Sequence, residues 1–194
     1  MNLENAMSVQ PTDNGRIMRN LALGANFISS HILHFYHLAA LDYINTTGVI
    51  DMAPWAPRHV TDDMVGGDTA AALVGHYVQA LEMRRKAHQM GAVLGGKMSY
   101  SPIFIPGGST ESPTAERIAD YRTLLSELQL FIDNIMIPDV NAVGSLFPQY
   151  ASLGQGCGNL LSYGVFDLDS VGQNKLFDQG RYAGASLKVS IRTR

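Results

Sequence analysis

The feature that most constrains the fold is the stretch from Leu21 to Leu41, which contains no Asp, Glu, Lys or Arg. Its length would allow a helix to cross a bilayer. It also carries residues that hydrocarbon penalises: Gly24, Asn26, Ser29, Ser30, His31, His34 and His37. Apolar side chains surround the helix axis, which is typical of a helix buried inside protein. We therefore predict a central helix that begins at Asp13 or Asn14, either of which could cap it, and ends near Asn45.

Two further long helices are predicted from apolar spacing and from residues that begin or end helices. Asp68 is the expected N-cap of a helix over 69–94, which Gly95 and Gly96 end. The third helix begins at Ser112, with Pro113 in its first turn, and Pro138 closes or kinks it. The expected apolar stripe of the second helix is Leu73, Val74, Tyr77, Val78, Leu81 and His88. That of the third is Ile118, Tyr121, Leu125, Leu128, Ile132 and Ile135.

The rest of the chain is predicted to contain loops, one short helix and a few strands. Residues 52–67 and 97–112 are rich in Gly and Pro and are expected to be loops, and 139–147 a short helix. Short strands are expected at 163–168 and 186–191. The predicted fold class is mainly α, a bundle of about three long helices with a small β-rich C-terminal segment. We treat the chain as a single segment, helical over 1–150 and β-containing over 151–194.

Charged residues are scarce, at 16% of the chain against about 25% in soluble domains. We infer that another component covers part of the surface. The formal net charge of −3 argues against a nucleic-acid partner. The single cysteine, Cys157, excludes an internal disulfide and a Cys-rich metal site. Met1 to Gln10 carries Glu4 and no apolar run, so we expect no signal peptide.

His31, His34 and His37 form the densest cluster of reactive side chains. Steps of three residues spread them over about 120° of one helix side. The pattern fits packed histidines, a metal site, or a role in hydrogen bonding and proton transfer near another group. The nearest acidic residue, Asp42, lies more than one turn beyond His37, so no ligand set is complete locally. The residues alone predict no self-sufficient active site and no catalytic residue.

For the other groups of polar residues, a structural role is a simpler explanation than a catalytic or ligand-binding role. Arg84, Arg85 and Lys86, with His88 just after them, lie near the end of the second helix, where cations suit the helix dipole. Lys97 follows two glycines but lacks the remaining spacing of a phosphate loop.

Several segments resemble the large subunits of nickel–iron hydrogenases, in the same order and over nearly the whole chain. Arg19-Asn20-Leu21, Gly24-Ala25 and His31 to Asp42 (HILHFYHLAALD) are similar to the family's "RNL…GA…H-x-x-HFYHL-x-ALD" pattern. Gly95-Gly96-Lys97 with Pro106-Gly107-Gly108 resembles its "GGK…GG" loop. Met136 to Val140 and Gly154 to Gly164 are also similar to family segments.

The resemblance implies an enzyme that interconverts dihydrogen with protons and electrons. In that family the large subunit holds a nickel–iron centre on four cysteines, which come as two CxxC pairs. This sequence has neither pair, and Cys157 is not in a CxxC context. We expect the chain to correspond to the region between the two pairs, with no metal ligand and no cofactor of its own. The 194 residues alone are then expected to bind no nickel and to lack hydrogenase activity.

What the resemblance implies for single residues is modest. His34 matches a family histidine near an iron–sulfur cluster of the small subunit, where an imidazole would tune redox potential or proton movement. His31 and His37 are weaker candidates for such a role. Lys97 matches the lysine of the GGK loop, but Ser99 and Tyr100 stand where the family usually has Pro and His.

The expected partners are the small iron–sulfur subunit and the remainder of the large subunit, with no nucleic acid and no direct membrane span. Alone, the chain is expected to self-associate through apolar surface. One alternative is a non-catalytic helical protein-interaction module, and another is an independent His-ligated metalloprotein. The compartment is not assigned, because in this family the small subunit usually carries the targeting signal.

Overall fold

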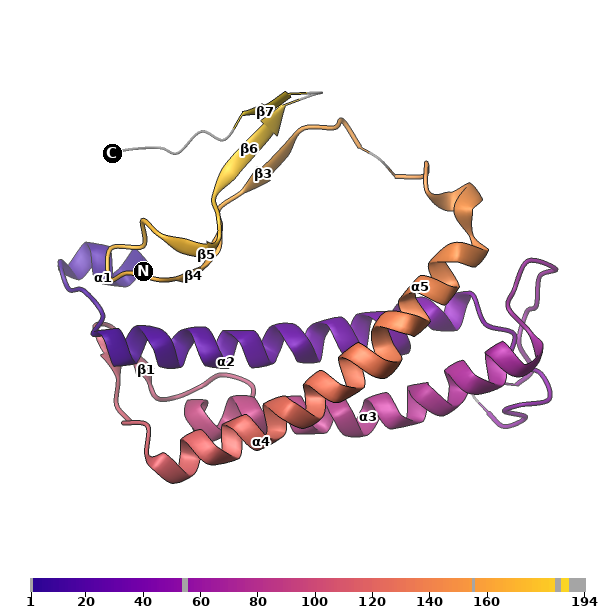
Figure 1. Cartoon of the computed structure of the whole chain (residues 1–194), viewed down its shortest axis with the longest axis horizontal. Helices are drawn as coiled ribbons and strands as arrows, with labels where there is room; N and C mark the ends of the chain where they lie inside the picture. Colours follow the sequence, from indigo (N-terminus) through magenta and orange to yellow (C-terminus); the bar gives the residue numbers. More distant parts are fainter. Residues whose placement is uncertain (1, 54–55, 155, 184–185, 189–194) are drawn as a thin grey trace.

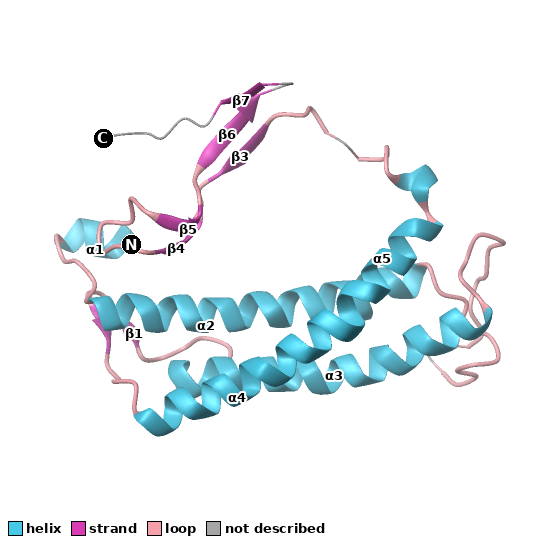
Figure 2. Cartoon of the chain, in the orientation of Figure 1, coloured by secondary structure: helices cyan, strands magenta, loops and turns pink. Residues whose placement is uncertain are grey.

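A computed structural model describes residues 2–53, 56–154, 156–183 and 186–188. Figures 1 and 2 show two long helices side by side, a third that crosses them, and a β-rich C-terminal segment on one side. The predicted fold class, mainly α with a small β-rich segment, is confirmed. No helix in the described part of the chain is long and apolar enough to span a membrane. The division into 1–150 and 151–194 stays a prediction.

The central helix is continuous from Asp13 to Asp42 but changes its winding. Helix α2 (Asp13–Ile32) passes into a π-helical segment, η1 (Leu33–Ala39), and then a 3₁₀ turn, η2 (Ala40–Asp42). Its N-cap is Thr12, whose hydroxyl accepts a hydrogen bond from the Gly15 backbone at 3.2 Å, so neither Asp13 nor Asn14 caps it. A π-helical segment is uncommon and is often found at functional sites.

Helix α3 (Gly67–Gly95) runs antiparallel to α2, and helix α4 (Ala115–Phe131) crosses both (Figure 1). The N-cap of α3 is Gly66, so the predicted cap Asp68 lies inside the first turn. Thr114 caps α4 by accepting from the Arg117 backbone at 3.2 Å, two residues after the predicted start at Ser112.

Pro138 does not close the third helix. The helix continues through a π-helical segment, η3 (Ile132–Met136), into α5 (Ile137–Leu146). The Ile137 N–H bonds to the Ile132 carbonyl, five residues back, so the ordinary spacing is already interrupted just before the proline. The chain then makes a short 3₁₀ turn, η4 (Pro148–Tyr150). A short helix, α1 (Asn2–Met7), precedes α2.

The core lies between α2, α3 and α4 and uses many small residues. Its buried members include Met18, Ala25, Ile32, Tyr36, Ala80, Met83, Ala87, Met90, Leu94, Tyr121, Leu128 and Phe131. Close packing of α2 on α3 shows at Gly91, where an added Cβ would lie 3.4 Å from the Cβ of Ala25. Because alanine and glycine occupy the contact line, several large apolar residues predicted inside lie exposed: Phe27, Leu38, Val78, Leu81, Ile118 and Leu125. The central helix is therefore not covered on all sides by the described chain.

The strands are two to four residues long, which explains why most of them were not predicted. A hairpin of β1 (Phe104–Ile105) and β2 (Gly108–Ser109) lies within the segment predicted as a loop. Strands β4 (Val165–Asp167) and β5 (Lys175–Phe177) form a second hairpin. Strands β3 (Leu160–Ser162), β6 (Gly180–Ala183) and β7 (Ser186–Lys188) form an antiparallel sheet in the order β3-β6-β7.

The predicted strand over 163–168 begins only at Val165, because a turn with Gly164 at φ +71° precedes it. Of the predicted strand 186–191, residues 189–191 lie outside the described residues.

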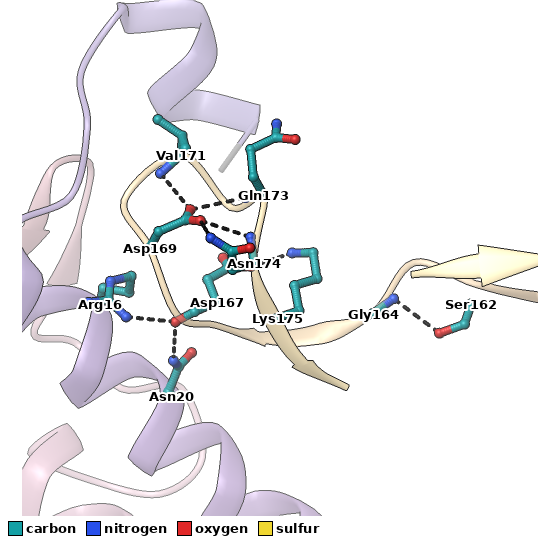
Figure 3. Close-up of polar contacts among 10 residues, drawn as sticks. All are labelled: Arg16, Asn20, Ser162, Gly164, Asp167, Asp169, Val171, Gln173, Asn174 and Lys175. Atoms are coloured by element: carbon teal, nitrogen blue, oxygen red, sulfur yellow. Dashed lines mark hydrogen bonds and ion pairs between the residues drawn. The ribbon is translucent and has the colours of Figure 1, made fainter. Parts of the chain in front are cut away.

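The β4–β5 hairpin is fastened to the N-terminal half of α2 (Figure 3). Arg16 and Asn20 both donate hydrogen bonds to the Asp167 carbonyl, each at 2.8 Å. The Asp167 carboxylate pairs with Lys175 across the hairpin. The Asp169 carboxylate accepts hydrogen bonds from backbone N–H groups of the connecting loop, including Asn174 at 2.8 Å. These contacts fix the hairpin beside the helix that carries the three histidines.

Candidate functional site

The three histidines of the central helix point in different directions, so they do not form one site. His31 and His34 are exposed, whereas His37 is half-buried against α3. The described residues contain no group of three or more His, Cys, Asp or Glu side chains that could hold a metal. Residues three apart differ by about 60° in direction around an α-helix axis. The π-helical winding of Leu33–Ala39, which contains His34 and His37, changes this step and spreads the two side chains further.

His31 lies at the rim of an apolar groove. Its Nδ1 donates a hydrogen bond to the Phe27 carbonyl one turn earlier, at 2.8 Å. The groove, of about 520 Å³, lies between α2, the η3–α5 helix and the β4–β5 hairpin. Its lining is mostly apolar, with Phe27, Ile137 and Phe177 among its residues. His34, by contrast, has no hydrogen bond to any described residue.

His37 is packed between the two antiparallel helices. Its Nε2 lies 3.3 Å from the Tyr77 carbonyl, and its ring meets the Tyr77 ring edge to face at 4.7 Å between centroids. Burial lowers the pKa of His37, the hydrogen bond to Tyr77 partly opposes this, and the charge of Arg84 lowers the pKa further. The imidazole is therefore neutral at pH 7, with Nε2–H donating to Tyr77. Its Nδ1 is buried and has no hydrogen-bond partner in the described chain.

Lys97 lies far from the histidines. It is exposed and follows the C-terminal end of α3, where Gly95 approaches Ala22 of α2. His37 contacts α3 at its other half, near Tyr77. Fifteen helical residues separate Ala22 from His37, which is about 22 Å along the axis. The lysine and the histidines are therefore separate features, and the roles that the resemblance implies for them stay predictions.

A partly buried polar cluster that the sequence did not reveal joins η1, α3 and α5. The Tyr36 hydroxyl donates to Asp139 Oδ2 at 2.6 Å, and His76 Nδ1 lies 2.7 Å from the same oxygen. Tyr36 is 1% exposed, and its burial, followed by the bond to Asp139, raises its pKa well above the usual range. This cluster (Tyr36, His76 and Asp139) ties η1, α3 and α5 together directly beside His37.

The only sequence signal for this cluster is that Asp139 is an acid within the apolar run from Met136 to Val140. Nothing local links it to His76, which is 63 residues away.

The described residues do not fit a nickel–iron centre. Such a centre needs several thiolates, and Cys157 is the one cysteine of the chain. It is exposed on a turn, with its Sγ 3.9 Å from the Asn159 carbonyl. No step of a reaction through the metals can therefore be assigned to these side chains.

The fold is that of part of a hydrogenase large subunit. In the crystal structure of the oxidised Ni-Fe-Se hydrogenase from Desulfovibrio vulgaris Hildenborough, the matching region superposes with a TM-score of 0.90 at 37% identity, covering 97% of this chain and 39% of that one. The profile of the nickel-dependent hydrogenase family matches residues 1–71 and 58–191. The chain belongs to the nickel-dependent hydrogenase family, as the resemblance implied.

Named relatives agree with this assignment. The periplasmic [NiFeSe] hydrogenase large subunit of Desulfomicrobium baculatum is 39% identical over 188 residues, covering 92% of this chain and 36% of the relative. The hydrogenase-2 large chain of Escherichia coli (strain K12) is 26% identical over 233 residues, covering 95% and 41%. The chain thus spans about two fifths of the length of these relatives. The alternative of a non-catalytic interaction module is not favoured.

Proposed function

We propose that this chain supplies the helical middle part of the catalytic subunit of an enzyme that interconverts dihydrogen with protons and electrons. The observation that carries the proposal is the shared fold and 37% identity with a solved Ni-Fe-Se hydrogenase over 97% of the chain. When bound, a nickel–iron centre supplies the chemistry at dihydrogen, and its thiolate ligands come from outside these residues. An iron–sulfur small subunit is the proposed electron-transfer partner.

In this proposal the residues of this chain do not bind the metals. They hold the helices and the histidines in place around the region that the metal centre would occupy. The partly buried cluster of Tyr36, His76 and Asp139 holds the π-helical segment against α3 and α5. That segment carries His34 and His37 on different sides, one exposed and one half-buried. An exposed imidazole with no hydrogen bond to any described residue can donate to a neighbouring subunit, so His34 is the best candidate for tuning electron or proton transfer. His31, His37 and Lys97 are weaker candidates for the same role.

The proposal is tested by His34→Ala in the complete enzyme. We expect dihydrogen oxidation with an artificial electron acceptor to fall several-fold while the nickel content stays at the wild-type level. His59→Ala is the matched control, since His59 is also exposed but lies in the loop before α3. Nickel loss in the His34 variant would show instead that this residue supports the metal site. A complete wild-type complex that binds nickel but does not turn over dihydrogen would refute the proposed function.

A further inference from the structure

One face of the α2–α3 pair carries a cation that has no counter-charge. Tyr77, Arg84 and His88 are spaced by seven and four residues, which places them on one side of α3 within about 40°. His37 of the π-helical segment contacts this side through Tyr77. Helix α4 packs against a different side of α3, where Lys86 pairs with Glu127 at 2.9 Å. We call the face formed by His37, Tyr77, Arg84 and His88 the Arg84 face.

Arg84 differs from its two basic neighbours in sequence. Arg85 pairs with Glu82, one turn earlier, and Lys86 pairs with Glu127 of α4. Arg84 is half-buried, yet it has no ion pair or hydrogen bond to any described residue, and its Nε is shielded from solvent. A partly buried guanidinium without a partner is unfavourable, because desolvation is not offset by hydrogen bonds or by an opposite charge.

The titratable groups beside Arg84 on this face are imidazoles, and none of them supplies a negative charge. Burial and then the charge of Arg84 lower the pKa of His88, and Arg84 also acts on His37. No acidic side chain pairs with His37, Arg84 or His88 in the described part of the chain, although the chain as a whole has a net charge of −3. The shortage of negative charge is therefore local to this face.

We propose that the Arg84 face is a docking surface for a carboxylate-bearing segment of the iron–sulfur small subunit, with Arg84 forming the central ion pair. The inference rests on the proposed function, because it takes the small subunit as the partner. A carboxylate matches the guanidinium in charge and can accept two parallel hydrogen bonds from it. Arginine is also enriched among the residues that dominate binding at protein interfaces.

The groove beside His31 and the Arg84 face differ in polarity, and this difference favours a second subunit as the partner that covers the Arg84 face. The groove beside His31 is lined mostly by apolar residues, which suits the continuous interior of one folded chain. The Arg84 face combines a cation and two imidazoles with the aromatic ring of Tyr77. Interfaces between subunits use such charges to fix orientation and to exclude wrong partners.

The test compares Arg84→Gln with Arg85→Gln in the complete large subunit, co-expressed with its small subunit. Residue 85 is the matched control, because Arg85 is adjacent, exposed and already paired with Glu82. We expect Arg84→Gln to weaken association of the two subunits by at least roughly 30-fold, and Arg85→Gln to leave it within about twofold. Association is measured from the dissociation of the purified complex on dilution. Arg84→Lys, which keeps the charge but not the planar geometry, is expected to lie between the two.

A second measurement does not depend on any variant folding correctly. Arginine modification by phenylglyoxal, read by mass spectrometry, is compared in the free large subunit and in the wild-type complex. Arg84 should be protected in the complex, whereas Arg85 should react equally in both.

Equal modification of Arg84 in the two states would overturn the proposal, as would wild-type association of a folded Arg84→Gln subunit. A complex that shows the expected protection but has no dihydrogen turnover would refute the proposed function and leave the docking surface standing.

Discussion

At the scale of single residues, the arginine of the RNL segment has a structural explanation. Arg19 donates to Glu4 at 2.7 Å and to the backbone carbonyls of Ile105 and Gly108. The Glu4 carboxylate, 3% exposed, also accepts from the Gly107 backbone at 3.1 Å. One buried ion pair therefore joins α1, α2 and the β1–β2 hairpin. Two segments that carry the family resemblance, RNL and PGG, meet at this pair.

Glu4 should make the stability of the chain dependent on pH in the acid range. Burial raises the pKa of Glu4, but hydrogen bonds, including those from Arg19 and Gly107, outweigh this and lower the pKa from 4.5 to about 2. Because the pKa of Glu4 is lower in the folded than in the unfolded state, its ionised carboxylate stabilises the fold. This stabilisation is complete above pH 4.5 and is lost as the pH falls toward 2. This stabilisation by the Glu4 carboxylate amounts to about 1 to 3 kcal/mol. We expect Glu4→Gln to lower the free energy of unfolding by about 1 to 3 kcal/mol at pH 7 and to remove this acid dependence.

Urea unfolding of the chain at several pH values between 7 and 2.5 measures the effect. Glu111→Gln is the control, since Glu111 pairs with Arg117 at 2.8 Å on the surface and should contribute less than about 0.5 kcal/mol. A difference between wild type and Glu4→Gln that stays constant over this pH range would contradict the assignment.

The candidate site shows at the same scale what a sequence can and cannot reveal. The i, i+3 spacing identified His31, His34 and His37 but placed them on one side of the helix, whereas the structure exposes His31 and His34 and packs His37 against α3. It could not show that Tyr36, between them, bonds to Asp139, because that contact joins residues 103 apart. The sequence placed Arg84 near the end of its helix, where the dipole favours cations, but the last turn of α3 carries no basic residue, so the dipole does not explain it. Only the packing shows that Arg84 lacks the partners that Arg85 and Lys86 have.

At the scale of elements, periodicity predicted the long helices but not their ends. The cap was predicted at Asp13 or Asn14, residue types that rank above threonine at this position, but the structure uses Thr12 next to them. The π-helical segments η1 and η3 leave no signature in apolar spacing, although η3 explains how a helix continues through Pro138. Strands of two to four residues are too short for alternation to identify, so β1, β2, β3, β5 and β6 were missed.

Two glycines in helices test how elements pack on each other. An added Cβ at Gly15 of α2 would lie 2.7 Å from the Cα of Gly108, which is backbone and cannot move aside easily. At Gly75 of α3, apart from its chain neighbours and the backbone of its own helix, no atom of the described residues lies within 4 Å of an added Cβ. We expect Gly15→Ala to destabilise the chain by about 1 to 3 kcal/mol through overpacking, and Gly75→Ala to stabilise it by about 0.5 to 1 kcal/mol.

Thermal unfolding of both glycine variants gives the comparison. Equal effects of the same sign at the two positions would show that α2 does not approach the β1–β2 hairpin as closely as described.

At the scale of the whole molecule, the low content of charged residues is accompanied by exposed apolar surface. The groove between α2, α5 and the β4–β5 hairpin includes exposed Leu176 and Phe177, which are 62% and 58% accessible. Soluble monomers rarely expose a contiguous apolar patch of this kind without a partner. From the composition we predicted that another component covers part of the surface, but the composition could not show which part. The structure places one contiguous part of the exposed apolar surface in this groove, beside α2 and apart from the Arg84 face.

The isolated chain is therefore expected to self-associate through this groove. Leu176→Ser removes apolar area from the groove and should weaken association roughly tenfold, since burying a leucine side chain contributes about 1.5 to 3 kcal/mol. Leu130→Ser is the control, because Leu130 is 64% exposed on α4 outside the groove. Sedimentation velocity over a range of protein concentrations gives the association constant of each. A wild-type chain that stays monomeric at high concentration would contradict this prediction, and equal weakening by both variants would place the contact elsewhere. Selective weakening by Leu176→Ser would identify the groove as the apolar surface that the complete protein covers.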